Sequence, residues 1–205
     1  MLAQGDNTGD ASVLDSVKAY IKIRDQKLGA VFLGLVHRLD RPTSGVMVLA
    51  KTSKALARLN KQFAEKTTQK TYWAIVAGTP ADGPTRLVHH LVRKPAQNKS
   101  FANNKEVPNS KRAELIYTKR KILNRYCLLE IELLTGRHHQ IRAQLNSEGI
   151  FIKGDLKYGA PRPNKDGSIH LHARKLTLIH PTLKDTVSFT ATPPKDPLWD
   201  VILSN

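Results

Sequence analysis

The chain has 205 residues, of which 40% are hydrophobic and 24% charged, so it can bury a core and is not disordered by composition. Lysine and arginine number 33 against 17 acidic residues, giving a formal net charge of +16. This excess favours a polyanionic partner, above all nucleic acid. No run of about 18 apolar residues is present, which argues against a transmembrane helix.

The cysteine content and the first residues bear on the cellular compartment. Cys127 is the single cysteine and sits in an apolar run, which excludes an internal disulfide and predicts a buried thiol in a reducing compartment. Residues 1–10 have neither the positively charged nor the apolar region of a signal peptide. We therefore expect a cytoplasmic protein. We also expect a monomer that binds no membrane and has no obligatory protein partner.

Two helices are expected in the first third of the chain. Ser12 begins the first in the manner of a capping box, with Asp15 in place of the usual glutamate. Thr52 or Ser53 can be the N-cap of the second. Its apolar residues recur at helical spacing, and they are Ala55, Leu56, Leu59 and Phe63.

Two short apolar runs, residues 31–36 and 46–50, predict buried strands because they are rich in branched residues and bounded by turn signals. Pro42 and Gly45 predict a tight connection between them. This connection also carries Asp40 between two arginines. A simple interpretation is a surface loop whose opposite charges pair with each other.

The rest of the chain is richer in strands than in helices. The basic segment 93–111 is predicted to be a long loop that either becomes ordered on RNA or is simply flexible. A helix is expected over 137–147, stopped by Gly149, and a last helical turn after Asp196. Strands are expected over 71–77, 112–119, 125–134, 150–153, 170–179 and 186–190. This pattern predicts an α+β fold with a mixed, mostly antiparallel β-sheet flanked by helices.

Three motifs in this order resemble those of the RluA-type RNA pseudouridine synthases. The first motif segment covers residues 37–45 and begins with His-Arg-Leu-Asp at 37–40. The second is Lys-Thr-Tyr at 70–72, and the third motif segment is Leu-Leu-Thr-Gly-Arg-His-His-Gln-Ile-Arg at 133–142. Residues 154–159 and 170–173 agree as well. A single four-residue match would be weak, but ordered matches are far more specific.

The resemblance implies a fold, a reaction and three catalytic residues. It implies one pseudouridine synthase catalytic domain over residues 1–205, with a central RNA-binding cleft and no separate N-terminal RNA-binding domain. The target base is flipped out. Asp40 would then act at the target ribose, Tyr72 would stack on the base, and Arg142 would pair with Asp40 and lower its pKa. The isomerisation needs no cofactor and no metal.

Further residues near the motifs are candidates for binding RNA. Arg38 would fill the gap left by the base or hold a phosphate, and its simple alternative is a solvated arginine. The others are His37, Arg41, Lys70, Arg137, His139 and Gln140. Ile141 and Leu145 are expected in the apolar wall of the pocket, although helix residues at this spacing usually just pack. His138 and Arg142, four residues apart, are expected on one helix face.

Two other classes of function remain open from the residues. One is an RNA-binding or chaperone module without chemistry, against which the presence of Asp40, Tyr72 and Arg142 speaks. The other is a nucleoside hydrolase or glycosidase, but such enzymes usually need two carboxylates or a metal-bound water. The histidines lack the spacing of a zinc site. We therefore expect isomerisation of uridine in structured RNA, with ribosomal RNA favoured over transfer RNA.

Overall fold

The computed structural model describes residues 12–204, so residues 1–10, considered above for a signal peptide, lie outside the described part. The chain forms two compact units. The first comprises residues up to 41 together with 47–68 and 177–188, and the second comprises 42–46, 69–176 and the residues from 189 onward. Each unit is described by itself.

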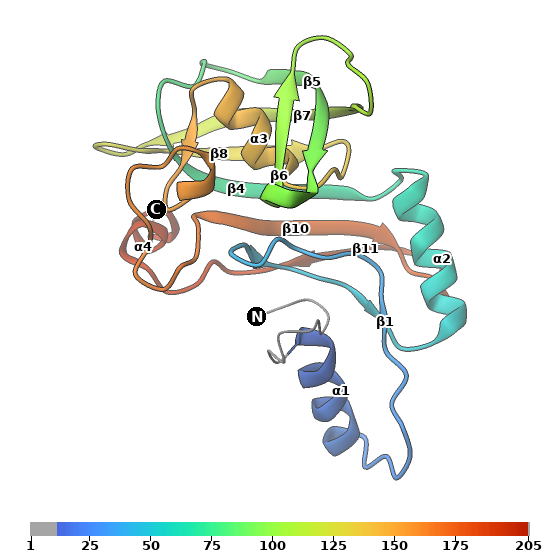
Figure 1. The fold of residues 1–205 in the computed structure, drawn as a ribbon. Coiled ribbons are helices and arrows are strands. Elements are labelled where there is room, and N and C mark those ends of the chain that lie inside the picture. Colours follow the sequence, from blue (N-terminus) through green and yellow to red (C-terminus); the bar gives the residue numbers. More distant parts are fainter. Residues whose placement is uncertain (1–11, 205) are drawn as a thin grey trace. The chain divides into compact units, whose positions relative to one another are not determined.

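The first unit holds two helices and a small antiparallel strand pair (Figure 1). Its elements are α1 (Val13–Arg24), β1 (Gly34–Leu35), β3 (Leu49–Ala50) and α2 (Ser53–Ala64). Both predicted N-caps are confirmed, because the Ser12 and Thr52 hydroxyls each accept a hydrogen bond of 3.1 Å from the amide three residues on. The two apolar runs form strands that pair in antiparallel fashion, but these strands are shorter than expected.

The second unit is built on one large sheet, whose strands lie in the order β11-β10-β4-β8-β7-β5-β6. Of these, β10 and β11 continue into the first unit. Nearly all pairs are antiparallel, so the predicted α+β fold is confirmed. The strands are β2 (Ser44–Gly45), β4 (Gln69–Ala77), β5 (Thr85–Lys94), β6 (Lys99–Asn103), β7 (Lys111–Ile122), β8 (Cys127–Leu133), β9 (Phe151–Ile152), β10 (Leu171–Ile179) and β11 (Thr186–Thr190).

Helices pack on both faces of this sheet. They are α3 (Gln140–Ser147) and α4 (Pro197–Leu203), and two short 3₁₀ turns, η1 (Pro95–Gln97) and η2 (Leu156–Tyr158), complete the unit. Successive strand residues point to opposite faces. Accordingly, Ala74 and Leu129 share a core cluster with Ile141 of α3, whereas their neighbours Ile75 and Leu128 pack against Trp199 of α4. The predicted last helix is confirmed, with Asp196 as its N-cap.

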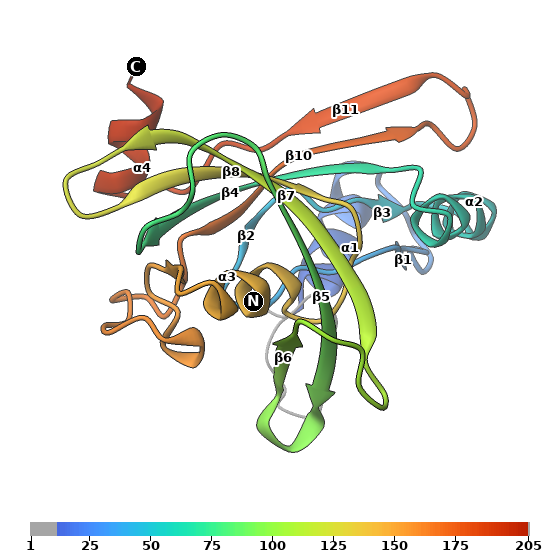
Figure 2. The ribbon, with the colours of Figure 1, turned by 90° about the horizontal axis from the view of Figure 1, so that it is seen from above.

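The basic segment 93–111 differs from its prediction. Its first half is not a loop, because β6 pairs with β5 in an antiparallel hairpin closed by η1 (Figure 2). Part of β6 is also buried. Ser100 is 2% exposed, and Ala102 packs against a cluster that contains Ala143 of α3. Small alternating side chains let this strand lie under the helix, a signal hidden by the density of lysine and asparagine.

Helix α3 begins three residues later than predicted. His139, its N-cap, has a left-handed backbone with φ of 52°, which no residue inside a helix adopts. His138 therefore precedes the helix, and the expectation that it shares a helix face with Arg142 was wrong.

The connection between the two apolar runs is more than a turn. Ser44 and Gly45 form β2, which pairs in parallel with His172 and Ala173 of β10. Gly45 has φ of +125°, and a Cβ atom there would lie 2.4 Å from both the amide nitrogen and the carbonyl oxygen of Ala173. Only glycine allows this approach of two backbones. The sequence predicted the turn residue but not its strand partner.

Candidate functional site

The first motif segment starts in the first unit, with His37 fixed by two contacts. Its Nε2 accepts a hydrogen bond of 3.0 Å from the amide of Val48, and its ring stacks on Phe63 with centroids 4.8 Å apart. A ring that accepts at Nε2 carries its proton at Nδ1. Asp40 is partly buried in the same unit, and both Arg38 and Arg41 are exposed.

The end of the first motif segment belongs to the second unit and is held there by backbone and side chain. The Ile169 amide donates to the carbonyl of Pro42 at 3.0 Å, and the Val46 amide donates to that of Ala173 at 2.9 Å. Ser44 lies 2.8 Å from Nδ1 of His172. The other ring nitrogen of His172 is 3.0 Å from a backbone carbonyl and must donate to it, so Nδ1 accepts from the serine hydroxyl.

Tyr72, of the second motif, lies on β4 opposite Ile131 of β8. It is partly buried and packs against the main core cluster, which also contains Ile141 and Leu145. Those two residues are 4% and 0% exposed, so they are core residues as well as candidates for a pocket wall. Lys70, two residues before Tyr72, has its Nζ 3.6 Å from where a Cβ of Gly136 would lie. The second and third motifs therefore meet.

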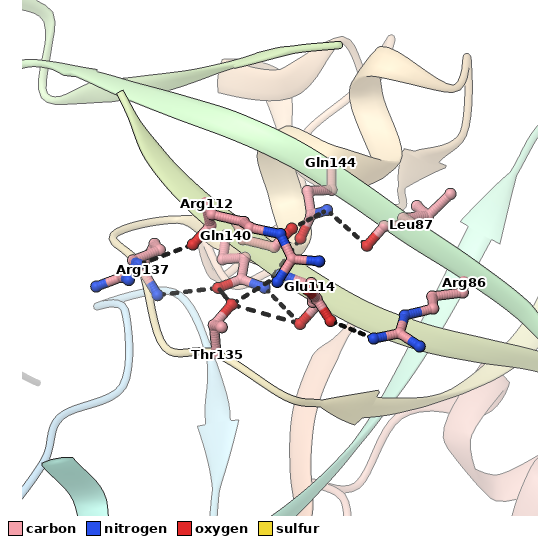
Figure 3. A network of polar contacts seen from close by, with 9 residues as sticks. Arg86, Leu87, Arg112, Glu114, Thr135, Arg137, Gln140 and Gln144 are labelled. Carbon is pink, nitrogen blue, oxygen red and sulfur yellow. Dashed lines mark hydrogen bonds and ion pairs between the residues drawn. The ribbon is translucent and has the colours of Figure 1, made fainter. Parts of the chain in front are cut away.

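The third motif segment is tied together by Thr135 and Gln140 (Figure 3). The Thr135 hydroxyl donates to Oε1 of Gln140 at 2.7 Å, and the Arg137 amide donates to the same oxygen at 3.0 Å. The Gln140 amide group donates to the carbonyl of Glu114 and to Oε1 of Gln144, both at 2.9 Å. This network fixes the turn before α3 against β7.

Gln140 is only 3% exposed, and both ends of its amide are engaged within the protein. Such a side chain positions the motif and offers RNA no direct contact. In contrast to Gln140, Arg137 is exposed, and its Nε donates to the carbonyl of Arg112 at 3.2 Å.

Arg142 forms a buried, two-pronged ion pair with Asp155. Its Nε donates to Oδ2 at 2.6 Å and its Nη2 to Oδ1 at 2.7 Å. The side chains are 5% and 1% exposed. Asp155 lies in the Gly-Asp-Leu-Lys-Tyr-Gly sequence that agreed with the family, but its role was missed. A carboxylate in a matched motif, thirteen residues from an arginine, was the available signal.

Tyr158 and His139 complete the surroundings of Arg142. The guanidinium lies 4.9 Å from the centroid of the Tyr158 ring. The Tyr158 hydroxyl accepts from the Ser100 amide at 2.8 Å, donates to the Ser100 carbonyl, and lies 3.0 Å from Nδ1 of His139. Burial, with a contribution from the charge of Arg142, lowers the pKa of His139 from 6.5 to about 3. His139 is therefore neutral near pH 7.

Two further histidines, His89 and His170, have partners within the protein. His89 is buried against Gln144, and His170 lies 3.0 Å from both Asn164 and Asp196. Within residues 12–204, no group of three or more histidine, cysteine or acidic side chains is arranged to hold a metal ion. None of the described helices is long and apolar enough to cross a membrane.

The fold is that of solved pseudouridylate synthase domains. A human protein titled RNA pseudouridylate synthase domain containing 4 superposes with a TM-score of 0.80 at 23% identity, over 98% of this chain and 85% of its own. The human domain containing 1 gives a TM-score of 0.71 at 22% identity, over 90% of this chain and 77% of its own. The fold therefore defines the class as an α+β protein with the fold of pseudouridylate synthase domains.

Sequence comparison specifies the family. The model described as RNA pseudouridylate synthase matches residues 5–147. An uncharacterised RNA pseudouridine synthase of Synechocystis is 36% identical over 78% of this chain and 50% of its own length. Ribosomal large subunit pseudouridine synthase C of Buchnera aphidicola is 34% identical over 85% and 56%. The chain belongs to the RNA pseudouridine synthase family, and it spans about half the length of these curated relatives.

Proposed function

We propose that the protein isomerises uridine to pseudouridine in structured RNA, with Asp40 as the residue that acts on the target ribose. The observation that carries the proposal is the meeting of the second and third motifs, at Lys70 with Gly136 and at Tyr72 with the core cluster that contains Ile141, in a chain whose first motif supplies a carboxylate. The reaction breaks the N1–C1′ bond, rotates the uracil and rejoins it through C5, so no atom is gained or lost. It requires no cofactor.

A short stretch of backbone ties Asp40 to a segment that belongs to the second unit. Asp40 precedes Pro42 by two residues, and the Pro42 carbonyl accepts from Ile169 in the second unit. Two residues span about 7 Å at most, so Asp40 cannot stray far from that anchor. We propose that Arg142 pairs with Asp40, and that Tyr72 stacks on the flipped uracil. An ionised, oriented carboxylate oxygen is what attack or proton abstraction at a sugar carbon needs.

RNA contact is proposed for the exposed cations of the motifs and for the β5–β6 hairpin. Arg38 and Arg41 are exposed beside Asp40, while His139 and Gln140 have positioning roles. His37, Lys70 and Arg137 stay candidates. Ribosomal RNA is the proposed target, because several relatives, including those of Buchnera and Vibrio cholerae, are named for the large ribosomal subunit. The proposed compartment is the cytoplasm, and the proposed state is a monomer.

The hairpin and the turn η2, which contacts its tip, carry cations that no acid of the described chain neutralises. Arg93, Lys94 and Lys157 are exposed, and none is paired with a carboxylate within residues 12–204. Lys157 donates to the carbonyl of Asn98 at the hairpin tip, at 3.1 Å. In contrast, cations on the adjoining strands, such as Arg120, have carboxylate partners. A preformed cluster of uncompensated charge fits the phosphates of RNA.

The activity is tested with purified protein and RNA transcripts of the large ribosomal subunit that carry no modification. Digested RNA is separated by liquid chromatography with mass spectrometry, since pseudouridine and uridine have equal masses and differ in retention. The wild type is expected to form pseudouridine, and Asp40→Asn to form none while binding RNA within a few-fold. An Asp40→Asn variant with near-normal turnover would refute the role of Asp40. If no RNA is modified by the wild type, including transfer RNA, the proposed function fails.

The RNA surface is tested by the salt dependence of binding. Each phosphate contact on single-stranded RNA contributes about −0.7 to the slope of log K against log salt, so replacing Arg93, Lys94 and Lys157 with glutamine should flatten the slope by about 2. The matched control removes the same charge from cations that have acid partners, at Lys61, Lys119 and Arg120. Equal slopes for the two triple variants would mean that the hairpin does not bind RNA.

A further inference from the structure

Arg142 is held before any substrate arrives, and Asp155 is what holds it. Both prongs of the pair are short, at 2.6 and 2.7 Å, and both side chains are almost completely buried. The Asp155 carboxylate takes the edge formed by Nε and Nη2. A guanidinium has a second edge, formed by Nη1 and Nη2, which is turned away from that carboxylate. A second acceptor can therefore be bound without breaking the first pair.

Asp155 compensates the charge of Arg142 inside the second unit. The ring of Tyr158 lies against the guanidinium, and His139 carries no charge near pH 7 because burial lowers its pKa to about 3. A second cation, Lys99, also lies over this ring, with its Nζ 4.9 Å from the centroid of Tyr158. A buried arginine without its carboxylate would be strongly unfavourable.

Compensation by Asp155 has a consequence for catalysis. A lone buried guanidinium would hold a neighbouring carboxylate strongly ionised and bind it tightly. An arginine already paired with one carboxylate exerts a weaker field on a second. The second carboxylate then stays ionised but keeps more of its basicity and nucleophilicity, which a reacting aspartate needs.

We propose that Asp155 is a positioning residue of the active site, which fixes the orientation of Arg142 and moderates its charge so that Asp40 is held but remains reactive. This inference rests on the proposed function, because it assigns Arg142 to Asp40. Asp155 contacts neither substrate nor Asp40 in this account. Its effect passes through the guanidinium.

The test uses Asp155→Asn, which keeps the shape and one acceptor oxygen but removes the charge. The substrate is the unmodified transcript that the wild-type protein is found to act on. Its single-turnover rate of pseudouridine formation is measured from pH 5 to 9, alongside RNA affinity. We expect the rate at pH 7 to fall by about 100-fold, as expected for a displaced catalytic group, with affinity within a few-fold. The acid limb of the profile should move to lower pH, because an uncompensated Arg142 lowers the pKa of Asp40.

Two comparisons separate this role from a purely structural one. Glu130→Gln removes another arginine–carboxylate pair, that of Glu130 with Arg120, and should leave the rate and its acid limb unchanged. Arg142→Leu should move the acid limb in the opposite direction, to higher pH. A folding defect would lower the fraction of active enzyme equally at every pH and would not move the limb.

A measurement on the wild type covers the case in which Asp155→Asn does not fold. The Nε–H of Arg142, assigned by its loss in Arg142→Lys, should exchange slowly with solvent in nuclear magnetic resonance spectra, both in free protein and with RNA bound. Rapid exchange, a wild-type rate for Asp155→Asn, or an unmoved acid limb would overturn the proposal. If Asp40→Asn is also fully active, the proposed function has failed instead.

Discussion

The first and third motif segments contrast in how their polar residues are used. In the first, Arg38 and Arg41 are exposed and Asp40 is partly buried. In the third, residues 139, 140 and 142 are 8%, 3% and 5% exposed, and each bonds to other protein groups. Both segments resemble motifs of the same family, and both lie within the part of the chain that the family model matches. Much of the third motif therefore builds the scaffold, and a motif match alone does not identify the residues that touch RNA.

The largest effect on stability is expected where the first motif segment joins the sheet. Gly45→Ala should destabilise the protein by at least about 3 kcal/mol, because the new Cβ would meet the Ala173 backbone at 2.4 Å and φ is +125°. The free energy of unfolding from urea titration measures this. Gly83→Ala is the matched control, with φ of +76° and nothing within 4 Å. Equal losses in both variants would show that conformational strain alone, without the close approach, explains the glycine.

A smaller, pH-dependent effect is expected from the third motif segment. His139 has its pKa lowered to about 3 by burial, so between that value and 6.5 the unfolded chain binds a proton that the folded protein does not. Stability should therefore fall as the pH drops below about 6.5, with a slope of up to about 1.4 kcal/mol per pH unit from this residue.

His139→Asn tests that expectation, because asparagine tolerates the left-handed backbone at this position. Urea titrations of both proteins at pH 7, 6 and 5 give the slope. The variant should lose part of the decline, and His170 and His172, whose pKa values are lowered in the same direction, should account for much of what remains. An identical decline in both proteins would mean that folding does not lower the pKa of His139.

The sequence predicted the fold where local signals and burial agree. Such signals mark both N-caps of the first unit, the strand pair of residues 170–190 and the alternating strand that ends before Thr135. The failures depend on partners far along the chain. β6 is a strand because β5 and α3 lie beside it, and α3 starts late because Gln140 bonds back to Thr135 and Arg137. For Asp155 the matched motif was the only signal, because its pairing with Arg142 follows from the fold.

For the candidate site, residue types were predicted better than their arrangement. The roles of Asp40, Tyr72 and Arg142 come from the resemblance and stay predictions. Ile141 and Leu145, expected in a pocket wall, lie in the core cluster against which Tyr72 packs. Periodicity could not show that Gln140 and His139 would be buried, because the same letters suit an RNA-binding turn. Charge counting found the cationic hairpin but took it for a loop. Long-range hydrogen bonds decide these roles, and they leave no local pattern.

The central claim is that Arg142 holds Asp40 within one active site. The most direct measurement is a single-turnover pH–rate profile for the wild type, Arg142→Leu and Arg142→Lys, each checked for folding by urea titration. Without the guanidinium the pKa of Asp40 should rise, so Arg142→Leu should lose more activity at neutral than at alkaline pH. Arg142→Lys should recover only part of the loss, since an ammonium lacks the paired donors. Equal losses at every pH would contradict the claim and leave Arg142 with a role in the fold or in RNA binding alone.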